Sequence, residues 1–235
     1  MIDKTEIKNT TGLVWFGNDL RIHDNDVLSL AVKNHSKVIG IYSIDPSLFK
    51  ENEFGFKKMD VFRAQFLLES LFDLQQQLLT KNISLLVFLD KPENKLKTIC
   101  DSYQIDSIYK QKEWTYEENI SKIKVQKSLH HNIKIIEVYN QFLYHPEDVN
   151  IKIESIPQVF SNLRKKLEKY VAIRANTEVL KLDSTNIINT KNYIPTLNEL
   201  GFSLFEKDKN TAFPFKGGES EALKRLNTVS YTHLT

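Results

Sequence analysis

Five short apolar runs, most of them β-branched or aromatic, alternate with stretches of helical periodicity, and this alternation limits the fold more than any other feature. The runs are Leu13–Phe16, Val38–Ile44, Ile83–Leu89, Ile105–Tyr109 and Ile133–Val138. Most are continuously apolar, as expected of strands covered by helices on both faces. Alternating strands and helices favour a parallel sheet with right-handed crossovers. The sequence therefore predicts an α/β fold with a doubly wound, five-stranded parallel sheet up to about residue 138.

Three helices can be placed from their patterns. From about Asp60 to Thr80, leucine and alanine recur every three or four residues, which indicates a helix with one apolar face. Thr115 and Glu118 form a capping-box pattern at the start of a second helix. Ser155 and Gln158, with Pro157 between them, predict the start of a third helix that covers about residues 156–171.

The composition is that of a soluble globular protein, with 41% hydrophobic and 26% charged residues. The 235 residues predict one or two domains, and a formal net charge of +2 neither requires nor excludes a nucleic-acid partner. Cys100 is the only cysteine, which fits a reducing compartment. The N-terminus resembles no secretory signal, and no apolar run has membrane-spanning length. We therefore expect a cytoplasmic, monomeric protein.

The residues that follow the first strand predict the place of a binding site. A strand at Gly12–Phe16 leads into the polar segment Gly17–Arg21, and then into a helix that Asp24 or Asn25 can cap. Ligands of parallel sheets bind where such loops gather, beyond the carboxyl ends of the strands. This pattern indicates a site region and names no ligand.

After residue 138 the alternation stops. Residues 139–212 are polar with a single helix near 156–171, which is typical of an interdomain linker. Residues 213–227 predict a new helix that begins after a Gly-Gly turn. Residues 228–235 continue neither its pattern nor an apolar face, so we expect either a disordered tail or a non-native junction where a longer reading frame was cut. We favour the junction, because a helix start with nothing to pack against is incomplete.

Several separated motifs, in order, resemble the cryptochrome/DNA photolyase family. VWFGNDLRIHDN (residues 14–25) resembles the opening motif of the family, except that Gly17 stands where the family usually has arginine. LYHPEDVNIKIESIPQVFSNLRKKLE (residues 143–168) is most similar to the DASH-type cryptochromes, with Ser161 and Leu163 as mild departures. FKGGESEALKRLN (residues 215–227) resembles the motif with which the family enters its helical FAD-binding domain.

The resemblance implies that the chain is the N-terminal antenna half of a blue-light flavoprotein. Methenyltetrahydrofolate would pass excitation to FAD, which the missing domain would bind. The whole protein would repair cyclobutane pyrimidine dimers, chiefly in single-stranded DNA, as a photo-lyase, or it would sense light. Trp15 and Trp114 both lie in the α/β half, so neither can be assigned to the electron-transfer tryptophans of the family. The fragment alone would not be catalytic.

Glu113 is the leading candidate for antenna binding. It follows the strand Ile105–Tyr109 on the loop before the Thr115 cap, at the ligand-binding edge of the sheet. Family members that use a folate antenna have a glutamate in the matching loop, and a carboxylate can accept two adjacent N–H donors of a pterin. The alternative is a solvated glutamate that benefits from the helix N-terminus. Gln111 and Lys112 share the loop and have weaker claims.

Asn18, Asp19 and Arg21 lie on the first loop of the predicted site. They would contact the antenna or a second domain, or they would hold the loop through an Asp19–Arg21 or backbone hydrogen-bond network. We favour the second interpretation, and we expect His23 to pack or bond within the same loop rather than to catalyse.

Other chemistry-bearing residues have simpler interpretations. The adjacent histidines 130 and 131 lack the companions of a metal site, so we expect no metal. Cys100 is interpreted as a buried, inert thiol. Gly217-Gly218 lacks the spacing of a phosphate loop, and its family role would be to shape the start of the flavin domain. The basic run 164–169 is interpreted as a solvated helix face rather than a DNA-binding face.

Two alternative functions stay open at this point. One is a flavodoxin-like, nucleotide-binding regulatory module without photochemistry. The other is a blue-light photoreceptor without repair activity, which would share every motif described above.

Overall fold

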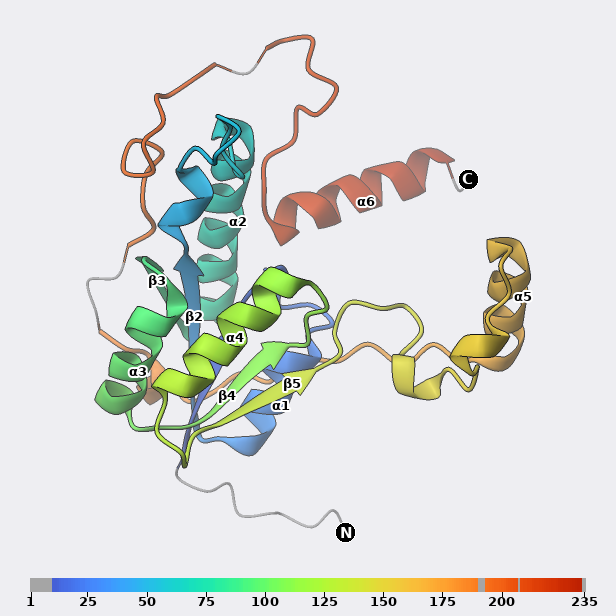
Figure 1. Ribbon diagram of the computed structural model, residues 1–235, viewed down its shortest axis with the longest axis horizontal. Coiled ribbons are helices and arrows are strands. Elements are labelled where there is room, and N and C mark those ends of the chain that lie inside the picture. The colour runs from blue at the N-terminus through green and yellow to red at the C-terminus, as the bar shows by residue number, and fades with distance from the viewer. Residues whose placement is uncertain (1–9, 190–192, 207, 234–235) are drawn as a thin grey trace.

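Five parallel strands form the central sheet of the computed structural model, which describes residues 10–189, 193–206 and 208–233, the last four by backbone alone. The sheet order is β3-β2-β1-β4-β5 (Figure 1). This confirms the predicted doubly wound α/β fold. The strands are β1 (Thr11–Trp15), β2 (Lys37–Ile44), β3 (Ser84–Leu89), β4 (Ile105–Gln111) and β5 (Lys134–Val138).

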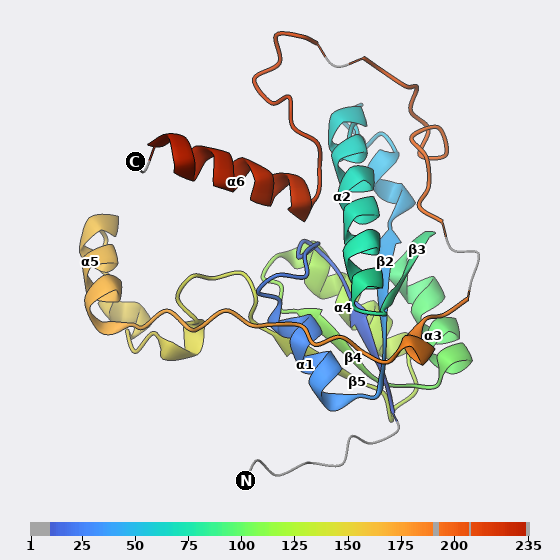
Figure 2. The same ribbon diagram turned by 180° about the vertical axis from the view of Figure 1, so that it is seen from behind.

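Helices cover both faces of the sheet. Helices α1 (Asp26–Asn34) and α2 (Val61–Thr80) lie on one face, and α3 (Pro92–Tyr103) and α4 (Tyr116–Ser128) lie on the other (Figures 1 and 2). Because successive side chains of a strand point to opposite faces, the end of β1 supplies both cores. Val14 and Phe16 pack on the α1/α2 side, and Leu13 and Trp15 pack on the α3/α4 side.

The strand order places a topological switch point between β1 and β4. From β1 the chain continues outward to β2 and β3, then returns to pair β4 with the other edge of β1. This is the Rossmann order, whereas a flavodoxin would have the order 2-1-3-4-5. The loops after β1 and β4 diverge at the switch point, so a crevice opens where the sequence predicts a binding region.

Asp24 and Asn25 were the two candidates for the N-terminal cap of α1, and Asn25 is the cap residue. Its Oδ1 accepts the N–H of Leu28 at 2.9 Å, and its Nδ2 donates to the Arg21 carbonyl at 2.8 Å. Asp24 instead has a left-handed backbone, with φ of 48°. The cap therefore also fixes the polar loop between β1 and α1.

Residues 139–212 contain three 3₁₀ helices and one α-helix in their described part. They are η2 (Pro146–Asp148), η3 (Ile153–Ser155), α5 (Phe160–Tyr170) and η4 (Ser184–Asn186). Helix α5 lies away from the sheet (Figures 1 and 2). The prediction that Ser155 and Gln158 start this helix was wrong, because Val159 is the N-terminal cap residue. Proline disfavours a helical backbone at the residue before it, and Ile156 is extended with φ of −66° and ψ of 123°.

The buried amide of Asn186 helps to join this segment back to the sheet. Asn186 donates from Nδ2 to the carbonyls of Val38 and Asn82, and its Oδ1 accepts the N–H of Val38 at 3.0 Å. The Asn186 side chain therefore takes the place of a backbone hydrogen-bond partner beside β2. It holds the chain that follows α5 against the amino end of the sheet.

Helix α6 (Glu219–His233) begins beside α2 (Figure 1). The N–H of Gly217 donates to Glu69 Oε2 at 2.7 Å, and the N–H of Ser220 donates to Asp73 Oδ2 at 2.9 Å. A Cβ at Gly217 would stand 2.2 Å from the carbonyl oxygen of Phe66, and Gly218 has φ of 114°. The two glycines are needed here for close approach to α2 and for a left-handed turn.

Residues 228–233 do not form the disordered tail that was one of the two alternatives for residues 228–235, because helix α6 continues through them. The hydroxyl of Thr228 donates to the Lys224 carbonyl at 2.9 Å within this helix. Residues 234–235 lie outside the described part of the chain. Among the described residues, no helix is long and apolar enough to cross a membrane.

Glu219 connects α6 to the loop that follows β1. Its Oε2 accepts the N–H of Ile22 at 2.9 Å, its Oε1 accepts the N–H of His23 at 3.0 Å, and the His23 ring lies 3.1 Å from Oε1. His23 therefore bonds between two elements, rather than within its own loop as expected. Its exposed imidazole contributes to the contact between α6 and the loop after β1.

A buried histidine supports the amino end of the sheet. His35 Nδ1 lies 2.8 Å from the Thr10 hydroxyl, and Nε2 lies 2.9 Å from the Tyr109 hydroxyl. Burial lowers the pKa of this imidazole, and the nearby charge of Asp106 opposes the shift only in part. The folded state therefore favours the neutral ring.

This depressed pKa predicts that stability falls in mild acid. The unfolded chain takes up the proton first, below the ordinary imidazole pKa of about 6.5. The free energy of unfolding should therefore be greatest above that pH, and should fall as the pH drops from about 7.5 to about 5.5. Urea denaturation at several pH values measures this slope. His35→Gln should reduce the slope, and His131→Gln, at an exposed site, should leave it unchanged. An equal slope in the His35→Gln variant would contradict the assignment.

The contacts of Glu219 predict a measurable effect on the β1 loop. Glu219→Ala removes the acceptor of two amide hydrogens, so exchange of the Ile22 and His23 amides should accelerate about tenfold, as for the loss of a charged hydrogen bond. Hydrogen exchange read by NMR measures this. Glu221→Ala is the matched control, because that carboxylate pairs with Lys224 on the same helix. Unchanged protection at Ile22 and His23 would show that α6 does not hold the loop.

Candidate functional site

A pocket of about 190 Å³ lies at the switch point, between the carboxyl ends of β1 and β4. Trp15, Phe16 and Gly17 form its β1 side, and Lys110, Gln111 and Glu113 form its β4 side. We call it the crevice pocket. Its remaining lining comes from the β1 loop, the end of β2 and the segments leading into α3 and α4: Asn18, Tyr42, Ser43, Asp45, Pro92, Glu118 and Ser121.

Gln111 and Glu113 act as one unit in this pocket. Gln111 is buried, and its Nε2 donates to Glu113 Oε1 at 3.1 Å. The half-buried Glu113 carboxylate reaches toward the β1 loop, since a Cβ at Gly17 would lie 3.4 Å from its Oε1. The amide therefore fixes the direction of a carboxylate at the point where the two loops meet.

Lys110 is a buried cation that the sequence analysis missed. It is 6% exposed, and its Nζ lies over the Trp15 ring, 4.7 Å from the centroid. Burial lowers the pKa of Lys110, and the charges of Glu137 and Glu113 oppose this. The sequence places Lys110 after an apolar run that ends at Tyr109, but β4 continues through Gln111, so the last two strand residues lie inside the site.

Glu118 was also missed, because it was assigned to a capping box. Thr115 is the N-cap residue of α4 but makes no side-chain cap hydrogen bond. Glu118 instead lines the crevice pocket, where its Oε2 is buried and lacks a hydrogen-bond partner among the described residues. The capping-box interpretation was therefore wrong, and the Glu118 carboxylate lines the crevice pocket instead.

Lys112 lies outside the crevice pocket, although it is adjacent in sequence to Gln111 and Glu113. Its Nζ donates to the Tyr139 hydroxyl at 2.9 Å, which raises the pKa of Lys112. The same ammonium lies over the rings of Tyr139 and Trp114, and these rings stack with centroids 5.7 Å apart. Alternation along the chain therefore sends Lys112 to an aromatic surface beside the pocket.

The candidate residues on the loop after β1 have two roles: some line the crevice pocket, and others hold the loop in place. Asn18 is exposed and lines the crevice pocket. Asp19 is buried, and its Oδ1 accepts the N–H of Gly17 at 2.9 Å. Arg21 donates from Nη2 to the carbonyls of Asn140 at 2.7 Å and Asp24 at 3.2 Å. Backbone hydrogen bonds thus hold this loop, as we favoured. Asp19 and Arg21 form no ion pair within 4.0 Å.

Burial dominates the ionisation of Asp19. It raises the pKa of this carboxyl, although the N–H of Gly17 and the charges of Arg21 and Lys110 favour ionisation. Burial also raises the pKa of Tyr42, which lines the crevice pocket, to about 12. Tyr42 therefore stays a neutral hydroxyl at physiological pH.

A second, larger cavity lies across the β1 loop, between α2 and α6. It has a volume of about 540 Å³ and shares Gly17, Asn18 and Tyr42 with the crevice pocket. Arg21 lines this cavity and is absent from the lining of the crevice pocket. The loop of residues 17–18 therefore separates two cavities.

The remaining candidates make ordinary contacts within the described residues. No group of three or more His, Cys, Asp or Glu is arranged to hold a metal within them. His130 pairs with Asp101 at 3.1 Å. Cys100 is buried, and burial raises the pKa of its thiol to about 12. The basic residues of α5 are exposed, with Arg164 paired to Glu168 at 3.3 Å.

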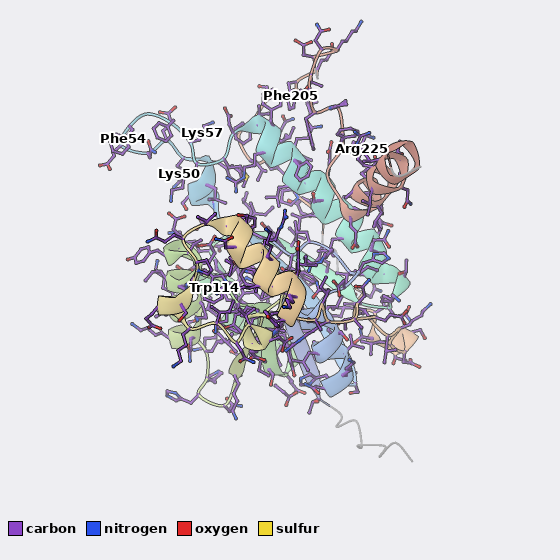
Figure 3. All side chains as sticks on the ribbon, turned by 90° about the vertical axis from the view of Figure 1, so that its right-hand side faces the viewer. Lys50, Phe54, Lys57, Trp114, Phe205 and Arg225 are labelled. Carbon is purple, nitrogen blue, oxygen red and sulfur yellow. The ribbon has the colours of Figure 1, made fainter. Side chains whose placement is uncertain are left out.

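Exposed aromatic side chains gather in more than one place. Phe54 and Lys57 project on the loop before α2, well away from Trp114 (Figure 3). The rings of Phe54 and Phe56 stack with centroids 6.2 Å apart. The crevice pocket differs from these surfaces because its polar groups are buried and converge.

Comparison with known proteins agrees with this architecture. The DNA photolyase family model matches residues 12–181. The cryptochrome DASH of Gloeobacter violaceus is 34% identical over 92% of this chain and 43% of its own length. The blue-light photoreceptor PHR2 of Arabidopsis thaliana is 32% identical over 93% of this chain and 50% of its own length. The chain thus spans about half the length of these relatives.

Solved structures show the same fold. The cryptochrome of Synechocystis superposes with a TM-score of 0.84 at 31% identity, over 94% of this chain and 46% of the other. A photolyase of Sulfolobus tokodaii, described with two FAD molecules, superposes with a TM-score of 0.71 at 21% identity, over 92% and 46% of the two chains. The family-model match over residues 12–181 and the DASH cryptochrome relatives show that the chain belongs to the DNA photolyase family, with DASH cryptochromes among its homologues.

Proposed function

We propose that the chain is the N-terminal antenna half of a DASH-type cryptochrome, and that Glu113 binds a methenyltetrahydrofolate antenna in the crevice pocket. Residues 1–138 form the antenna domain, 139–212 the linker, and 213–227 the start of a FAD-binding domain. The observation that carries the proposal is the Glu113 carboxylate, which a buried amide directs into the pocket at the switch point.

The residues of the pocket suit a pterin. A pterin edge presents adjacent N–H donors, and an ionised carboxylate can accept two of them. When bound, folate supplies absorption in the near ultraviolet. Gln111 orients Glu113, Trp15 provides an aromatic wall, and Asn18 lies at the rim. Asp19 and Arg21 support the loop, and Lys112 lies beside the pocket.

FAD and the reaction belong to the part of the protein that would follow α6. None of the described residues is assigned to the flavin, and Gly217-Gly218 packs against α2 rather than forming a phosphate loop. In this proposal the whole protein is a cytoplasmic monomer that uses light to split cyclobutane pyrimidine dimers. Single-stranded DNA is the favoured substrate, because taking a damaged base out of the stack costs least there.

Light sensing without repair is the second candidate, and it is supported by the Arabidopsis relative, which is named a blue-light photoreceptor. A nucleotide-binding module of flavodoxin type is disfavoured, because the sheet has the Rossmann strand order.

A repair assay separates the two candidates. The full-length protein under blue light should restore dimer-containing single strands at least about tenfold faster than duplexes, because the duplex must first be unstacked. Chromatography of the restored oligonucleotide measures the rate. Repair of neither substrate, with the flavin bound, would identify a photoreceptor.

The antenna assignment predicts a spectral change. In the full-length protein, Glu113→Ala should remove the near-ultraviolet folate band and retain the yellow flavin absorption, because in this proposal the carboxylate binds the antenna and not the flavin. Absorption spectra after purification with added folate measure both. Glu117→Ala is the matched control, since its carboxylate is exposed and pairs with Lys58. An unchanged folate band in the Glu113→Ala protein would refute the assignment.

A further inference from the structure

Both tryptophans of the chain carry a lysine ammonium over the ring. Lys110 Nζ lies 4.7 Å from the centroid of Trp15, and Lys112 Nζ lies 5.6 Å from that of Trp114. The first pair is buried, with Trp15 8% and Lys110 6% exposed. Among the described residues, the Lys110 ammonium has no hydrogen bond and no ion pair, so the indole face is its partner. Buried charges are normally paired with an opposite charge, so this placement is unusual for a residue that only stabilises the fold.

Carboxylates at longer range favour the charged form of Lys110. Burial lowers the pKa of this group, and the charges of Glu137, Glu113 and Asp19 oppose that effect. Glu137 itself pairs with Lys122 at 2.9 Å, so it does not neutralise Lys110 by direct contact. A positive charge is therefore kept beside the ring, and no neighbouring anion cancels it.

This charge makes Trp15 harder to oxidise. Indole is the side chain that most readily loses one electron, and the loss leaves a radical cation on the ring. That second positive charge would form 4.7 Å from the ammonium, in a buried site where like charges are poorly screened. Removing an electron from Trp15 therefore costs more free energy than removing one from an indole without a cation.

The crevice pocket, which Trp15 lines, also disfavours the other half of an electron transfer. Glu113 and Glu118 bring carboxylates to its lining, and these oppose an extra electron on any ligand. Tyr42 is the second readily oxidised side chain of the described lining, and burial raises its pKa to about 12. A phenol gives up an electron easily only when its proton can leave, so Tyr42 is a poor donor as well.

We propose that Lys110 prevents a light-excited ligand of the crevice pocket from taking an electron from Trp15. In the suppressed step, one electron passes from the indole to the excited ligand, which leaves a radical cation on Trp15 and a radical anion on the ligand. The excitation energy is lost as heat when the electron returns. The proposal rests on the proposed antenna function, because a ligand that must pass its excitation on needs this protection. Lys110 acts through Trp15 and need not touch the ligand.

Oxidation of Trp15 without any ligand is the first test. In the 235-residue chain with Trp114→Phe, a flash generates tris(bipyridine)ruthenium(III), and the visible absorption of the indole radical gives the oxidation rate of Trp15. Lys110→Met keeps the apolar stem and should raise this rate about tenfold, because the repelling charge is gone. Lys110→Gln should do the same, and the melting temperature of each variant shows that it is folded.

Two variants control for other effects of the substitution. Lys110→Arg keeps the charge and should keep the rate of the unchanged chain. Lys127→Met removes an exposed lysine of α4, and with it the same net charge, and should also leave the rate unchanged. Equal rates in the unchanged chain, Lys110→Met and Lys110→Gln would overturn the inference.

The fluorescence lifetime of bound methenyltetrahydrofolate is the second test, in the same chain, where no flavin drains the excitation. Lys110→Met should shorten the lifetime about threefold. Adding Trp15→Phe should restore it, because phenylalanine is far harder to oxidise. A lifetime that stays short after Trp15→Phe would show that the quenching does not pass through Trp15, and would overturn the inference.

The two tests separate failure of this inference from failure of the antenna function. If folate binds and Lys110→Met leaves its lifetime unchanged, the inference is overturned and the antenna function stands. If no folate binds, the antenna function fails and the protective role fails with it, while the oxidation rates still show whether Lys110 acts on Trp15.

Discussion

The pairing of β1 with β4 is the interaction on which the rest of the structure depends. β1 is bordered by strands on both sides, and its partners β2 and β4 carry the chain away in opposite directions. Two loops are thereby left apart at the carboxyl edge of the sheet, where buried side chains can face a ligand. The cores on the two faces fix both strands, so the pocket rests on rigid elements.

The sequence predicts the sheet well because the strand signal is local. Most of the strands are continuous apolar runs, and burial of the central strands on both faces leaves little room for another interpretation. The helix after Asp60 is predicted for the same reason, since its leucines form one face and Asp60 caps it. Glu113 and Gln111 follow from the position of β4, because chain order alone places their loop at the ligand-binding edge.

The failures arise where tertiary contacts decide between local options. Thr115 and Glu118 match the sequence pattern of a capping box, yet the Glu118 carboxylate lies in the crevice pocket. Lys112 lies between Gln111 and Glu113 in sequence, but its side chain points toward Tyr139 rather than into the pocket. Side chains at the end of a strand alternate in direction. Pro157 matches a helix start but holds Ile156 extended. Docking of His23 on Glu219 joins residues far apart in sequence, and no local pattern reports such a pair.

The anchoring of the returning chain has a consequence for how the protein varies in length. The segment from Asn186 to Gly217 is fixed at both ends. Asn186 fixes its first end to the sheet, and Gly217 fixes its last end to α2. Between two fixed ends, the entropy of closing a loop changes slowly with the number of residues. Because Leu197, Leu200 and Phe202 of that segment are buried in the core on the α2 face of the sheet, insertions and deletions cost little only at its exposed residues, such as 208–212. A single added residue near either anchor would shift a buried amide or a close backbone contact out of register.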